Sequence, residues 1–230
     1  MNPSRTTAWF VTGTDTGIGK TLVSCALLHA LRARGFQTAG MKPIAAGIEA
    51  DGSNEDVERL RAASSVRVDR RLANPYLLRQ PIAPHLAAAE EGVRLALPTI
   101  RDAFDALTER ADAVIVEGCG GFLVPLDDAQ DTADLALCLD LPVILVIGMR
   151  LGCLNHALLT QEAIARRGLA LAGWVANRID PQMRHFDGNL STLEARIAAP
   201  LLGVLPHMLH PDASRAAAHL TLPCGARTKC

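Results

Sequence analysis

The 230-residue chain has the composition of an ordinary globular protein, with 49% hydrophobic and 20% charged residues. Its 23 Lys and Arg nearly balance 24 Asp and Glu, so the net charge of -1 gives no large basic field to hold a nucleic acid or an anionic membrane. No apolar run reaches the ~18 residues of a membrane span, and the N-terminus lacks the blocks of a signal peptide. These features favour a cytoplasmic protein with a small-molecule partner.

Short β-branched runs alternate with stretches of helix length along the whole chain. In the first such stretch, Leu22, Ala26, Leu28 and Leu31 recur near helical spacing, and Gly35 follows as a stop signal. The alternation predicts one α/β domain over residues 1–230, with a mostly parallel sheet, helices on both faces and a weakly structured tail from about residue 212. The expected strands are 8–12, 38–41, 113–116, 143–147, 172–176 and 201–205.

A glycine-rich loop joins the first expected strand to the first expected helix, and residues 13–21 read GTDTGIGKT. Glycines let backbone N–H groups approach phosphate oxygens, a helix N-terminus adds partial positive charge, Lys20 adds a full charge and Thr21 offers a hydroxyl to Mg²⁺. The common GxxxxGK[ST] pattern requires glycine at position 14, where Thr14 stands. Despite this misfit, the strand and helix on either side predict a P-loop nucleotide-binding site.

Polar residues stand at the carboxyl ends of the expected strands, where open parallel sheets collect their ligands. Lys42, Glu117 and Asn177 end three of them. Taken alone, Lys42 is more typical of an exposed charge covering a sheet edge. Asp56 alone is typical of a solvated acid at a helix start.

Several blocks, in their order along the chain, resemble dethiobiotin synthetases, whose phosphate loop GTDTxxGKT is one residue longer than the common pattern. The resemblance runs from about residue 10 to about residue 206. The blocks are GMKPIAAG at 40–47, NPYLLRQPIAPH at 74–85, VEGCGG at 116–121, LPVILVIGMRLGCLNHALLT at 141–160 and AGWVANR at 172–178.

The resemblance implies a P-loop ligase of biotin biosynthesis that uses Mg²⁺, and ATP as co-substrate. Such an enzyme joins CO₂ to 7,8-diaminononanoate (diaminopelargonic acid) as a carbamate and phosphorylates the carbamate. It then closes the ureido ring of dethiobiotin, with release of ADP and phosphate. It also implies a homodimer, in which Asn155 lies where one subunit's helix start meets the diamine carboxylate of the other.

The family's site residues carry over onto matching positions of this chain. Lys42 is implied to neutralise the carbamate, Lys20 the phosphates, and Thr21, Asp56 and Glu117 to hold Mg²⁺. Nucleotide contacts are implied for Gly17, Ile18, Gly19, Lys20, Thr21, Leu22, Asp56, Glu117, Gly118, Cys119, Gly120, Asn177, Arg178, Pro206, His207 and Met208.

The chain also departs from the family pattern. Ala46 replaces a serine that contacts the diamine, and His207 replaces an aromatic residue near the base. Three alternatives stay open. The first is a partitioning-type regulatory ATPase, which is disfavoured because Asp15 stands at the position of its signature lysine. The second is a GTP-binding switch, which rests on a partial match to the NKxD motif that ends at Asp180. The third is a nucleotide-binding scaffold without turnover, which rests on Ala46 alone.

Overall fold

The computed structural model describes residues 6–223 and contains one six-stranded sheet. All of its strand pairings are parallel, in the order β2-β5-β1-β6-β7-β8, and a separate parallel pair, β3 and β4, lies outside it. The mostly parallel α/β fold predicted from the alternation is therefore confirmed. The strands are β1 (Thr7–Gly13), β2 (Thr38–Met41), β3 (Ile44–Ala46), β4 (Tyr76–Leu78), β5 (Ala113–Glu117), β6 (Val143–Gly148), β7 (Leu171–Asn177) and β8 (Leu201–Leu205).

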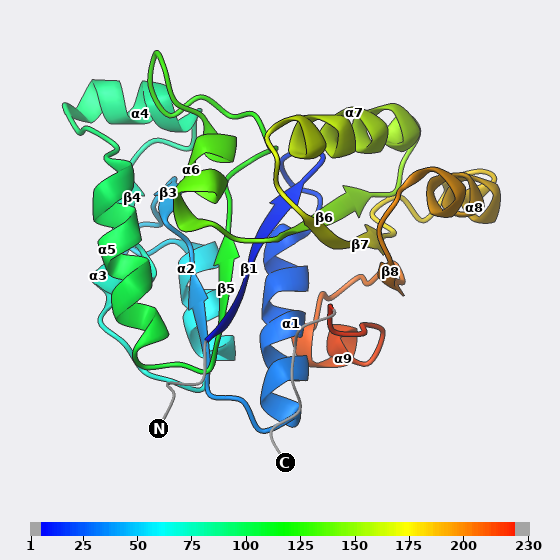
Figure 1. The fold of residues 1–230 in the computed structure, drawn as a ribbon, viewed down its shortest axis with the longest axis horizontal. Coiled ribbons are helices and arrows are strands. Elements are labelled where there is room, and N and C mark those ends of the chain that lie inside the picture. The colour runs from blue at the N-terminus through cyan, green and yellow to red at the C-terminus, as the bar shows by residue number, and fades with distance from the viewer. Residues whose placement is uncertain (1–5, 224–230) are drawn as a thin grey trace.

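Helices cover both faces of the sheet, and the central strands are buried on both sides. Along β1, Trp9 and Val11 pack with α1, α2 and α9, whereas Phe10 between them packs on the opposite face with α5 and α6. Figure 1 shows α1 beside α9, and α7 and α8 beside β6 to β8. The helices are α1 (Lys20–Ala33), α2 (Glu55–Ala63), α3 (Arg70–Ala73), α4 (Pro84–Glu91), α5 (Leu97–Thr108), α6 (Thr132–Leu139), α7 (Cys153–Arg166), α8 (Phe186–Arg196) and α9 (Ala213–Ala217).

Strand order places β1 between β5 and β6, where the direction of winding along the sheet reverses. Ligands of open parallel sheets bind outside the carboxyl ends of strands at such a point. The loop after β1 therefore opens onto the position where a ligand is expected.

The C-terminal region differs from the weak structure expected there. Helix α9 packs against α1, and Leu220 forms an antiparallel bridge with Gly203. Residues 224–230, with Cys224 and Cys230, lie outside the described residues. None of the helices in residues 6–223 has the length and apolar character that crossing a bilayer requires.

Candidate functional site

A cavity of about 920 Å³ lies at the carboxyl ends of β1, β2, β5 and β7. The phosphate loop borders it, as do Lys42, Glu117 and Asn177 from three strand ends. Most of the predicted site residues line it: Gly17, Gly19, Lys20, Thr21, Leu22, Lys42, Asp56, Glu117, Cys119, Gly120, Asn177, Arg178, Pro206, His207 and Met208.

Three predicted site residues do not line this cavity. The Ile18 side chain points into the core, and the Gly118 N–H donates to Val11 O at 2.9 Å, which continues the sheet pairing of β5. Asn155 is exposed in the first turn of α7. Ile18 and Gly118 therefore shape the site through the backbone, and Asn155 is not brought to the cavity of this chain.

The phosphate loop depends on glycine at position 19, which caps α1 in a left-handed conformation with φ 89°. A Cβ at Gly19 would lie 2.2 Å from Nδ2 of Asn177. That same Nδ2 donates to Ile18 O at 2.7 Å, so the end of β7 is bonded to the loop that follows β1. A side chain at position 19 would be strained at this φ and would displace the Asn177 amide from its bond to the loop.

Two lysines and two carboxylates meet inside the cavity. Nζ of Lys42 lies 2.5 Å from Oε1 of Glu117 and 3.1 Å from Oδ2 of Asp56. Lys42 is 6% exposed and Glu117 0%, so the alternative of an exposed lysine at a sheet edge is wrong. Asp56, the second residue of α2, is half-buried rather than fully solvated, because its carboxylate contacts Lys42 and Thr21.

Burial and charge act differently on the two lysines. Burial is the largest influence on Lys42 and opposes its charge, but the adjacent Glu117 and Asp56 outweigh it and hold the pKa of Lys42 above its usual value. Burial, followed by the charge of Lys42, lowers the pKa of Lys20. The Nζ of Lys20 donates to Asp15 O at 2.8 Å, within the phosphate loop. With Glu117 and Asp56 beside it, Lys42 therefore stays charged at neutral pH.

Oxygen atoms suited to a hard cation gather beside these lysines. The Thr21 hydroxyl lies 2.7 Å from Oδ1 of Asp56 and 2.9 Å from Oε1 of Glu117. Oε2 of Glu117 is buried and has no hydrogen-bond partner among the described residues. Mg²⁺ is commonly held by one or two carboxylates together with substrate phosphates, so this donor set fits it. Residues 6–223 contain no cluster of three or more His, Cys, Asp or Glu side chains for a metal held by protein alone.

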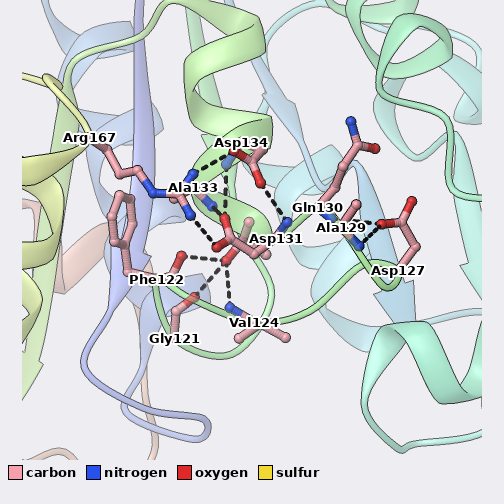
Figure 2. Close-up of polar contacts among 11 residues, drawn as sticks. Gly121, Phe122, Val124, Asp127, Ala129, Gln130, Asp131, Ala133, Asp134 and Arg167 are labelled. Atoms are coloured by element: carbon pink, nitrogen blue, oxygen red, sulfur yellow. Dashed lines mark hydrogen bonds and ion pairs between the residues drawn. The ribbon is translucent and has the colours of Figure 1, made fainter.

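The loop after β5 brings Cys119, Gly120 and Val124 to the cavity and is anchored to the start of α6. Thr132, which is fully buried, accepts a hydrogen bond from Val124 N at 3.1 Å and donates to Phe122 O at 2.7 Å (Figure 2). Burial raises the pKa of the Cys119 thiol, which makes it a poor nucleophile.

Arg167, at the end of α7, secures the same helix start. Its guanidinium lies 2.6 Å from Oδ2 of Asp131 and 2.5 Å from Oδ1 of Asp134, the two residues of the α6 capping box (Figure 2). All three side chains are partly exposed. The cavity loop is thus tied through α6 to the far end of α7.

Several residues that line the cavity have no role in the sequence prediction. Arg59 and Val124 had no local signal, because one is an ordinary helix charge and the other follows a glycine turn. Pro81 to Pro84 belong to the recognised block at 74–85, which was the available signal although no residue in it was given a role. Ala46, the departure from the family serine, faces the same cavity.

Comparisons with known proteins agree with this arrangement. Residues 7–214 match a family model described as an AAA domain. The chain is similar in fold to two solved structures: an FtsY signal recognition particle receptor from Elizabethkingia anophelis in complex with GDP (14% identity, TM-score 0.51, 98% of this chain and 63% of that chain) and the MinC:MinD cell division protein complex of Aquifex aeolicus (13% identity, TM-score 0.53, 92% of each chain). Likeness at such low identity shows the fold alone.

Sequence relatives are much closer. The chain is 61% identical over 219 residues to an ATP-dependent dethiobiotin synthetase of Aromatoleum aromaticum, covering 94% of this chain and 97% of the relative. It is 55% identical over 216 residues to the corresponding protein of Ralstonia nicotianae, covering 93% and 94%. On this similarity, together with the phosphate loop and the paired lysines of the cavity, the chain belongs to the ATP-dependent dethiobiotin synthetase family.

Proposed function

We propose that this chain catalyses ATP-dependent formation of dethiobiotin from 7,8-diaminononanoate and CO₂, through a carbamate that Lys42 neutralises. The observation that carries the proposal is the second buried lysine. Lys20 serves phosphate binding in any P-loop protein, whereas Lys42 adds positive charge at the neighbouring strand end of the same cavity. A carbamate anion that must meet a γ-phosphoryl group needs such a charge between the two.

The reaction balances in three steps. One amine of the diamine adds to CO₂ and loses a proton, which gives the carbamate. A carbamate oxygen attacks the γ-phosphorus of ATP, so ADP leaves and a carbamic–phosphoric anhydride remains. The second amine then attacks the carbonyl carbon and expels phosphate, which closes the ureido ring. A lysine is ordinarily charged at neutral pH, so Lys42 acts in these steps as a fixed ammonium and not as a base.

Magnesium fits the oxygen donors beside the phosphate loop. Thr21, Asp56 and Glu117 would hold it, with the unpartnered Oε2 of Glu117 as one available donor. When bound, Mg²⁺ neutralises negative charge on the phosphate oxygens during transfer. The protein's own contribution is to fix these three side chains from α1, α2 and β5.

We assign the purine to the end of the cavity near Asn177, with Pro206, His207 and Met208 lining it and ATP preferred over GTP. Asn177 and these three residues border the same cavity as the phosphate loop. Oδ1 of Asn177 is the atom not engaged by Ile18 O, so it is available to accept from an exocyclic amino group.

We further propose a homodimer working in the cytoplasm, where ATP is at hand. Two exposed leucines support the dimer: Leu151, in the turn before α7, is 96% exposed, and Leu159, within α7, is 57% exposed. Asn155 lies between them in the first turn. Unpaired N–H groups at a helix start suit a carboxylate, so this turn is where the diamine carboxylate of a second subunit would dock.

The test is product formation by the purified protein with the diamine, bicarbonate, ATP and magnesium, followed by mass spectrometry. We expect dethiobiotin with one ADP for each ring closed. Lys42→Gln should bind ATP nearly as the parent does, yet turn over roughly a hundredfold more slowly, the usual loss for one preorganised charge. A regulatory ATPase would instead hydrolyse ATP without the diamine, and wild-type turnover by Lys42→Gln would exclude the carbamate role.

A further inference from the structure

The main chain leaves the central sheet at Lys42, so its backbone has no partner in a strand ladder. Strand β2 ends at Met41, Pro43 has no N–H to donate, and β3 begins at Ile44 in a different sheet. Buried backbone groups nevertheless require partners. How this one residue is anchored therefore decides where its side chain begins.

Both polar groups of the Lys42 backbone are taken by the end of α3. The Lys42 N–H donates to Ala73 O at 2.8 Å, and the Lys42 carbonyl accepts from Nδ2 of Asn74 at 2.7 Å. Nδ2 of Asn74 also donates to Tyr76 O at 2.9 Å, at the start of β4. One amide group thus holds the Lys42 peptide and β4 together.

The Asn74 side chain is itself fixed. It is 5% exposed, and its own N–H donates to Arg70 O at 2.7 Å as the C-cap of α3. Both hydrogens of Nδ2 point to carbonyl oxygens, which sets the orientation of the amide. Neither alanine nor an apolar residue can donate to these two carbonyls.

We propose that Asn74 is a positioning residue for the reaction, which fixes the Lys42 backbone so that its ammonium reaches the carbamate. This inference rests on the role proposed above for Lys42. A lysine ammonium sits at the end of a four-carbon stem, so its place is set by where the backbone is held and by the groups it meets. A displacement of about 1 Å at a reacting centre can cost about a hundredfold in rate.

A purely structural role makes a different prediction. If Asn74 only packs the α3 and β4 junction, its loss lowers stability and leaves the contribution of Lys42 unchanged. If it acts through Lys42, its loss matters to the rate only while Lys42 is present. Non-additivity between the two positions separates these cases.

The experiment is a double-mutant cycle of Asn74→Ala and Lys42→Gln in the full chain. Single-turnover dethiobiotin formation is measured with saturating ATP, magnesium, bicarbonate and diamine, alongside ATP affinity by calorimetry and urea unfolding. We expect Asn74→Ala to slow turnover about tenfold to a hundredfold in the parent and less than about twofold in Lys42→Gln, with ATP affinity within about twofold. Leu193→Ala, at a fully buried position of α8, is the control for lost stability with turnover retained.

Equal rate losses in both backgrounds, or no loss in either, would overturn the positioning role while leaving that of Lys42 intact. Full turnover by Lys42→Gln alone would overturn the role of Lys42, and this inference with it. If Asn74→Ala is not recovered folded, Asn74→Ser replaces it in the same cycle. Serine provides a hydroxyl donor on a shorter side chain than that of asparagine. We therefore expect Asn74→Ser to recover part of the rate that alanine loses.

Discussion

Replacing Thr132 by valine tests the anchor of the cavity loop without changing the shape of the side chain. The hydroxyl that is lost accepts from Val124 N and donates to Phe122 O, at a position with 0% exposure. Each buried backbone group left without a partner costs about 1–3 kcal/mol of stability. Part of this cost is offset, because valine has no hydroxyl group that must be stripped of water when it is buried. The expected net loss in the free energy of unfolding is roughly 2–4 kcal/mol.

Thr132→Ser is the matched control, because it keeps the hydroxyl and loses one buried methyl, at about 1 kcal/mol. Urea unfolding of both variants should therefore rank valine as the less stable. In a thermal scan the valine variant should melt about 4 to 16 °C below the parent, at roughly 2–4 °C per kcal/mol for a chain of this size. If valine proves as stable as serine or more so, apolar burial decides this site and the hydrogen bonds do not.

Three further outcomes are expected. Glu117→Gln should leave the fold intact and raise the magnesium concentration needed for half-maximal turnover, and an unchanged magnesium titration would remove Glu117 from the metal site. Burial raises the pKa of Cys25 to about 12, so iodoacetamide at pH 8 should label it only after unfolding, as peptide mass spectrometry would show; rapid labelling of the native protein would contradict this. Leu151→Glu, in the turn before α7, should give a monomer in light scattering with the parent dimeric under the same conditions, and a dimeric variant would remove Leu151 from the proposed dimer surface.

The residues at the strand ends could be predicted because parallel strands bring their carboxyl ends to one edge whatever their order. That rule, with a strand recognised before each residue, was enough to place Lys42, Glu117 and Asn177 at this edge. It did not give their roles. The strand order itself could not be predicted, because it depends on which apolar faces pack in three dimensions. β3 and β4 were missed since three-residue strands carry too few positions to show a period.

The contacts that decide the state of the site are long-range and have no local signature. Lys42 is buried and charged because Glu117 stands 75 residues later, and a lysine before a proline gives no sign of that partner. The role of Asn74 was hidden for the same reason, since its donors serve a carbonyl 32 residues earlier. The family resemblance of the blocks at 40–47 and 74–85 linked both segments to the site, which periodicity could not do. It gave no role to Asn74 within its block.

The bond from Asn177 to Ile18 joins the two ends of the proposed nucleotide site directly. The strand end proposed to read the base and the loop proposed to hold the phosphates share one hydrogen bond and one close contact at Gly19. A loop already held in this way loses little conformational freedom when a ligand arrives, so less of the binding free energy is spent on ordering it. Because of the same bond, we expect a substitution at Asn177 to change phosphate binding as well as base preference, so the two properties would not be tuned independently at this position.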